Sequence, residues 1–245
     1  MRTLILTGYG INADRELAEA FRLAGAGPER VHTADVLEHP ACLASFDILA
    51  FPGGFSFGDH LGSGKVLAYL VKSRLKKELE AFVRDGKLIL GICNGFQVLV
   101  KMGILPNLGG DFTQEVSLIH NDSGLFTDRW VAVRWNAANP SPWIRGLGPI
   151  SYPIRHGEGR FITASPEAAK SIVDKNLAAL FYDGVNPNGS EMDIAGITDQ
   201  TGRILGMMPH PEAYLFPENH PAREQVSCAQ TGRGLFENAV AYALT

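Results

Sequence analysis

The chain has 245 residues, of which 45% are hydrophobic and 20% charged, and its formal net charge is −4 at pH 7. This length buries one full hydrophobic core without requiring another, so we expect a single domain over residues 1–245. A weakly acidic chain without a basic block lacks the clustered lysines and arginines that phosphate contacts need, which argues against nucleic acid as a main partner.

Cysteine and histidine usage argues against several other classes of protein. The three cysteines are Cys42, Cys93 and Cys228, and no C-x-x-C spacing occurs. An odd number without that spacing disfavours a disulfide framework or structural zinc and fits a reducing compartment, so we expect a cytoplasmic protein. The histidines show no H-E-x-x-H spacing, so no metal site is expected. The chain also has no signal-peptide pattern and no apolar run that could span a membrane.

The first hundred residues alternate between strand and helix patterns. Such alternation predicts an α/β fold with a mostly parallel central sheet flanked by helices. Functional groups of these folds collect beyond the carboxyl ends of the strands. Short apolar runs predict strands over 3–7, 47–51 and 87–91, and apolar residues at helical spacing predict helices over 14–24, 66–83 and 95–102.

A glycine-rich loop, PGGFSFGD, follows the second predicted strand over residues 52–59. Backbone N–H groups in such a loop can hold a negative oxygen. The spacing does not match a GxxxxGK[ST] phosphate loop. Glycine pairs are common in plain turns, so this loop is a weak signal by itself.

A sharp strand-to-helix turn, GICNG, follows the third predicted strand. Such a turn lifts one side chain clear of the sheet, and its glycines let a substrate come close. Cys93 occupies that position, where the helix N-terminus favours a thiolate. The turn therefore suits a nucleophile, although a buried core cysteine fits the local sequence equally well.

The pattern changes after about residue 116, where short strand candidates are separated by clusters of Asn, Gly and Pro. This change predicts mostly antiparallel strands appended to the parallel core, followed by a closing helix. The strand candidates are 130–134, 150–154, 178–182, 195–198 and 204–208, and the helix is 234–244.

A His-x-Glu pair, His210 and Glu212, follows the last of these strands in the segment MPHPE. In extended backbone, residues two apart point to the same side, so we expect both side chains to face one site. The carboxylate would orient the imidazole, and the imidazole would activate a thiol. The segment alone would also fit an exposed proline-bounded turn, but its occurrence together with the cysteine elbow favours a catalytic arrangement.

The assembled residues resemble the class I, or triad, glutamine amidotransferases. The elbow of that family reads G-x-C-x-G-x-Q and is matched here by Gly91, Cys93, Gly95 and Gln97, with His-x-Glu later in the chain. More narrowly, the chain is similar to the glutaminase subunits of phosphoribosylformylglycinamidine synthases. The segments that carry this resemblance are GINADRELAEAFRLAGA, PGGFSFGD, GICNGFQVL, HNDSGLF, HGEGR, NPNGS and MPHPE.

The resemblance implies a flavodoxin-like fold and a catalytic site in which Cys93 is the nucleophile and His210 and Glu212 complete a triad. It further implies that Gln97 contacts the bound glutamine, although a polar residue in the first turn of a helix needs no such role. The implied oxyanion hole consists of N–H groups from Gly53, Gly54 and Asn94.

The resemblance also implies partners. Glutamine would be hydrolysed through a cysteine thioester, and the ammonia would pass to a separate ATP-dependent synthetase subunit. That subunit converts phosphoribosylformylglycinamide to phosphoribosylformylglycinamidine in purine biosynthesis, and a small accessory subunit is a further candidate partner. No cofactor is expected in this chain, because ATP and Mg would be used by the synthetase.

Two positions depart from the family pattern. Phe57 stands where the family usually has Tyr in an SYGD loop, and Ala213 stands where it often has Arg after HPE. These departures concern local contacts or the partner interface.

Three other functions stay open for this chain. They are the glutaminase subunit of another class I amidotransferase, a DJ-1-like cysteine protein, and a non-catalytic regulatory subunit.

Overall fold

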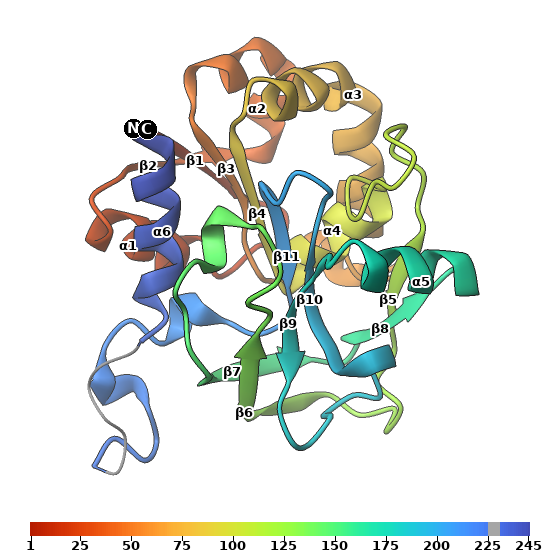
Figure 1. The fold of residues 1–245 in the computed structure, drawn as a ribbon. Coiled ribbons are helices and arrows are strands. Elements are labelled where there is room, and N and C mark those ends of the chain that lie inside the picture. Colours follow the sequence, from red (N-terminus) through yellow and green to blue (C-terminus); the bar gives the residue numbers. More distant parts are fainter. Residues whose placement is uncertain (225–230) are drawn as a thin grey trace.

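The computed structural model describes residues 1–224 and 231–245, and it is organised around one large mixed sheet (Figure 1). Nine strands follow the order β2-β1-β3-β4-β11-β10-β9-β6-β7. The strands from β2 to β11 are parallel, and every later pair is antiparallel. Their bounds are β1 Arg2–Thr7, β2 Gly27–His32, β3 Ile48–Phe51, β4 Leu88–Ile92, β6 Thr127–Trp135, β7 Ile150–His156, β9 Ala178–Tyr182, β10 Ile194–Thr198 and β11 Ile204–Met207.

The predicted antiparallel strands are appended to the parallel core within the same sheet. Four of them continue that sheet directly, because β10 pairs with β11. A second, two-stranded sheet joins β5 (Val116–Ile119) to β8 (Arg160–Thr163). These two short strands were not predicted.

Helices cover both faces of the large sheet (Figure 1). α1 packs with α6 on one face, and α3 packs with α4 on the other. The predicted helices lie within a residue or two of the observed ones, whereas α2 and α5 were not predicted. The bounds are α1 Asp14–Leu23, α2 Thr33–Glu38, α3 Lys65–Arg84, α4 Asn94–Met102, α5 Pro166–Asp174 and α6 Arg233–Ala243.

The order of the central strands determines where the candidate residues lie. All residues of β3, β4 and β11 are buried, because parallel strands covered on both faces need continuous apolar runs. These three strands are neighbours and run in the same direction. The segments that follow them, with Gly53, Cys93 and His210, therefore meet at one edge of the sheet.

Within residues 1–224 and 231–245, no helix is long and apolar enough to cross a membrane. The same part of the chain contains no group of three or more His, Cys, Asp or Glu side chains that could hold a metal ion.

Candidate active site

Cys93 lies at a strained elbow between β4 and α4. Its φ and ψ are 51° and −108°, a conformation that costs free energy in a residue with a side chain. The turn is tight, because a Cβ atom added to Gly95 would lie 1.9 Å from the carbonyl oxygen of Phe51. Cys93 is 5% exposed, and its Sγ donates to the carbonyl oxygen of Arg155 at 3.6 Å. The elbow thus has the geometry expected of a presented nucleophile.

His210 and Glu212 form the expected contact, but the backbone between them has a conformation different from the predicted one. Nδ1 of His210 lies 2.6 Å from Oε1 of Glu212, and both residues are buried. The extended conformation predicted for this pair is wrong, because Pro211–Ala213 forms a 3-10 turn. Pro211 lies at the first position of that turn, where its fixed φ is tolerated. The turn still brings the carboxylate onto the imidazole.

The electrostatics of His210 link it to both partners. Burial alone would lower its pKa, but interactions with the Glu212 carboxylate and the Cys93 side chain outweigh burial and raise the pKa above the ordinary histidine value. Its Nε2 atom is buried without a hydrogen-bond partner among the described residues. A Cβ atom added to Gly53 would lie 2.9 Å from Cε1 of His210 and 3.6 Å from Cβ of Cys93. Gly53 therefore lies directly against the two residues.

In the loop after β3, the backbone N–H of Gly54 takes no part in the pairing of this loop with residues 10–12. Gly54 and Ile11 form an isolated antiparallel bridge. The hydrogen bonds of that bridge join the flanking residues, from Asn12 N to Gly53 O at 3.2 Å and from Phe55 N to Gly10 O at 2.9 Å. The N–H of Gly54 consequently points away from residues 10–12. A Cβ atom at Gly54 would approach Gly10 O to 2.6 Å, so only glycine fits there.

The side chain of Asn94 fastens the same loop to α4. Its Oδ1 accepts a hydrogen bond from the N–H of Ser56 at 3.1 Å. As the first residue of α4, Asn94 has a backbone N–H without an acceptor inside the helix. The three residues predicted for an oxyanion hole, Gly53, Gly54 and Asn94, are thus in one place.

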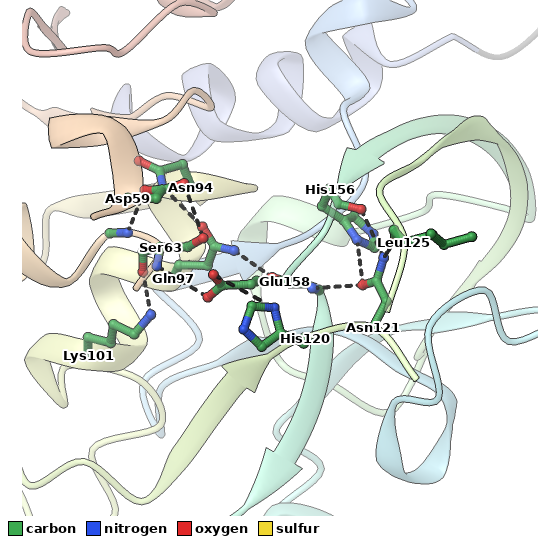
Figure 2. Close-up of polar contacts among 12 residues, drawn as sticks. Asp59, Ser63, Asn94, Gln97, Lys101, His120, Asn121, Leu125, His156 and Glu158 are labelled. Carbon is green, nitrogen blue, oxygen red and sulfur yellow. Dashed lines mark hydrogen bonds and ion pairs between the residues drawn. The ribbon is translucent and has the colours of Figure 1, made fainter. Parts of the chain in front are cut away.

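Gln97 lies one turn along α4, and its side chain is engaged within the protein (Figure 2). Its Nε2 donates to the carbonyl oxygen of Glu158 at 2.5 Å, and its Oε1 accepts from Nδ2 of Asn94 at 3.0 Å. Gln97 is buried, with an exposed fraction of 3%. Its observed role is to join the loop after β7 to the start of α4.

A buried histidine not singled out in the sequence, His156, ends β7. Its Nδ1 lies 3.0 Å from Oδ1 of Asn121 (Figure 2). Burial, followed by the charge of His210, lowers the pKa of His156 to about 4. The segments HNDSGLF and HGEGR, which carry part of the family resemblance, contain these two residues and were the available signal.

Phe57 and Ala213, which depart from the family pattern, lie in the loop after β3 and in the turn after β11 respectively. The ring of Phe57 stacks on that of Tyr9, with centroids 4.5 Å apart and planes inclined by 21°. Ala213 ends the 3-10 turn that carries Glu212. Cys42 is the less favourable nucleophile, because burial raises the pKa of its thiol. Cys228 is outside the described residues.

Comparisons with known proteins identify the family of the chain. A family model for the CobB/CobQ-like glutamine amidotransferase domain matches residues 1–243. The phosphoribosylformylglycinamidine synthase subunit PurQ of Dehalococcoides mccartyi is 42% identical over 255 aligned positions, which cover 99% of this chain and 98% of the relative. PurQ of Methanococcus maripaludis strain C5 is 38% identical, covering 90% of this chain and 86% of the relative.

Two solved structures resemble the fold. A chain in the structure of PurLQS from Thermotoga maritima has a TM-score of 0.76 and 28% identity, covering 98% of both chains. A glutamine amidotransferase from the same organism has a TM-score of 0.59 at 15% identity, covering 100% of this chain and 98% of its own. The second likeness concerns the fold alone.

Proposed function

The chain belongs to the CobB/CobQ-like glutamine amidotransferase family, and from this membership we infer that it releases ammonia from the side chain of glutamine. It is the glutaminase subunit of a phosphoribosylformylglycinamidine synthase, by its identity of 36–42% to PurQ subunits over nearly their full length. One observation carries the chemistry: Gly53, Cys93 and the His210–Glu212 pair meet at the ends of adjacent parallel strands.

In the proposed first half-reaction, the Cys93 thiolate attacks the amide carbon of the glutamine side chain. A carbon–sulfur bond forms, and the carbonyl electron pair moves to the oxygen. When the tetrahedral species collapses, the carbon–nitrogen bond breaks and His210 protonates the leaving nitrogen. Ammonia departs and a γ-glutamyl thioester remains. Glu212, hydrogen-bonded to Nδ1, holds the imidazole in orientation and stabilises its charged form.

The negative oxygen would be held by backbone N–H groups at the loop after β3 and at the start of α4. Gly54 supports this role because its N–H is not consumed by the bridge to Ile11. Asn94 supports it because its N–H opens the helix. Removing one such donor typically costs about 10²–10³-fold in rate.

In the second half-reaction, a water molecule loses a proton to His210 and attacks the thioester. The carbon–sulfur bond breaks, glutamate leaves and the thiolate returns. Free ammonia would be protonated in water, so the site has to deliver it directly to the enzyme that consumes it. We propose that this enzyme is a separate synthetase subunit, which uses ATP and Mg to aminate phosphoribosylformylglycinamide.

The assembly is proposed on two grounds. The similar solved chain comes from a structure of PurLQS, which supports a synthetase subunit and a small accessory subunit as partners. The sequence has no GxxxxGK[ST] phosphate loop, which supports the assignment of ATP and Mg to the synthetase. We further propose that the 245 residues act as one amidotransferase domain in the cytoplasm, without a cofactor of its own.

A reconstituted complex containing Cys93→Ala tests the proposal. Glutamine-dependent synthesis should vanish, because the thioester cannot form, whereas synthesis from added ammonium should survive on the partner. Unchanged glutamine-dependent synthesis would favour the non-catalytic subunit. Loss of both activities in an assembled complex would show that the chain does more than supply ammonia. A DJ-1-like protein would show no effect of the synthetase on glutamine turnover.

A further inference from the structure

Every polar group of Ser63 is bound by a charged side chain. Its N–H donates to Oε2 of Glu158 at 3.2 Å, and its hydroxyl donates to Oδ2 of Asp59 at 3.1 Å. Its carbonyl oxygen accepts from Nζ of Lys101. Ser63 is 6% exposed. Figure 2 shows the three charged groups converging on this one residue, an arrangement that an ordinary surface turn does not need.

The three charged residues come from three different segments. Asp59 ends the 3-10 turn Ser56–Asp59, Lys101 lies in the last turn of α4, and Glu158 lies in the loop after β7. Burial lowers the pKa of Lys101, and the carboxylates of Glu158 and Asp59 oppose that effect. The ammonium group is therefore balanced by the same carboxylates that bind Ser63. We call these four residues the Ser63 clamp.

The segment held by the clamp is strained. Phe57, Gly58 and Asp59 have φ values of 55°, 66° and 53°, so three consecutive residues are left-handed. Two of them carry side chains, for which this conformation is unfavourable. Such a backbone persists only where the surrounding contacts determine it. The clamp supplies contacts of that kind.

The strained segment is continuous with the loop that bears Gly53 and Gly54. Asn94 ties this turn to the start of α4, because its Oδ1 accepts from Ser56 N and its Nδ2 lies 3.3 Å from Oδ1 of Asp59. Glu158 contributes twice, since its backbone oxygen binds Gln97 while its carboxylate binds Ser63. A displacement of Ser63 would consequently reach the loop and the start of α4 together.

We propose that Lys101 and Glu158 are positioning residues that, by gripping Ser63, hold the loop after β3 in the arrangement that stabilises the oxyanion. This inference rests on the proposed glutaminase function. Both side chains bind Ser63 rather than the reacting atoms. An oxyanion donor acts chiefly in the transition state, so a loosened clamp should lower kcat and leave KM nearly unchanged.

The test compares Lys101→Met with Lys72→Met in the assembled complex. Lys72 is a matched control, because its Nζ also donates to a backbone oxygen, that of Phe112, at 2.6 Å, but away from the clamp. Glutamine hydrolysis by Lys101→Met should show kcat reduced about 10-fold or more with KM within about twofold, given the cost of losing an oxyanion donor. Lys101→Arg should recover part of the loss, and Lys72→Met should match the parent.

Glu158→Ala provides a second route if Lys101→Met does not fold. This variant retains the backbone oxygen that binds Gln97, and it should also lower kcat. The double variant should lose less than the product of the single losses, because both changes disable one device. A kcat for either folded single variant within twofold of the parent would overturn the clamp. Equal losses in Lys72→Met, or a change confined to KM, would overturn it as well.

The same experiment separates the two proposals. If all four proteins (the parent, Lys72→Met, Lys101→Met and Glu158→Ala) hydrolyse glutamine equally well, only the clamp proposal is wrong. If none of the four hydrolyses glutamine in a complex that still uses ammonium, the proposed function fails.

Discussion

Oδ1 of Asn121 lies 3.0 Å from Nδ1 of His156, and this contact determines which imidazole nitrogen carries the proton. The amide of Asn121 is oriented by its other contacts: Nδ2 donates to the carbonyl oxygens of Leu125 and His156, each at 2.9 Å, and Oδ1 accepts from Gly159 N. Because Oδ1 only accepts, Nδ1 of His156 must be the donor. Its Nε2 is left as a buried acceptor, without a hydrogen-bond partner in the described part of the chain.

Because of His156, the free energy of unfolding should fall as the solution becomes acidic. Its pKa is lowered from 6.5 to about 4 in the folded protein, so its contribution is complete above pH 6.5 and is lost as the pH falls through about 4. The loss can reach about 3 kcal/mol, at 1.36 kcal/mol for each unit of pKa. Urea unfolding between pH 7 and pH 4 should therefore be less pH-dependent in His156→Gln than in the parent. Parallel pH dependences in the two proteins would contradict this prediction.

Cys93 should be labelled by a glutamine-like electrophile before Cys42. Cys93 lies beside His210 and the helix N-terminus, whereas burial raises the pKa of the Cys42 thiol and reduces its thiolate fraction. Peptide mapping after partial inactivation should place the label on Cys93 in proportion to the activity lost. Inactivation with the label mainly on Cys42 or Cys228 would show that the nucleophile has been misassigned.

His210→Ala should reduce glutamine turnover more than Glu212→Gln. The imidazole performs both proton transfers, and loss of a general acid–base group typically costs about 10²–10⁴-fold in rate. A glutamine at position 212 could still accept the imidazole hydrogen bond, so part of the orientation should persist. Steady-state rates in the assembled complex measure the difference, with circular dichroism as the control for folding. Near-parental turnover in a folded His210→Ala protein would rule out the Cys–His–Glu mechanism.

Gly53→Ala should impair catalysis through a single added methyl group. The new Cβ would lie 2.9 Å from Cε1 of His210, closer than carbon atoms normally approach, so the imidazole must shift. We expect kcat to fall by about 10²-fold, as for misplacements of this size. Gly27→Ala is the control, because its Cβ would lie 3.5 Å from the nearest atom, Met1 O. Similar rates for the two variants would show that the approach of Gly53 to His210 is unimportant.

The central sheet could be predicted because its strands are uniformly apolar. The runs that form β3 and β4 are buried along their whole length, and no helical pattern competes with them. β2 was missed because GPERVH has no apolar run. It is an edge strand that exists through its pairing with β1, and such long-range pairing leaves no local pattern.

The candidate site likewise contains residues that could be predicted from the sequence and residues that could not. The elbow and the His-x-Glu pair have local spacings that suggested their chemistry, although the backbone conformation around Glu212 was mispredicted. Ser63 and Lys101 had no such signal, because Lys101 and Glu158 are 38 and 95 residues away from Ser63 in sequence. Only the folded chain brings these groups together.

The strained conformation of Cys93 sets activity against stability. At φ 51° and ψ −108°, glycine would be the more stable residue, yet glycine has no thiol. A selection for thermal resistance alone would therefore favour replacement of the very residue that we assign to catalysis. The cysteine at this position therefore lowers the stability of the folded chain while supplying the thiol that the proposed reaction requires.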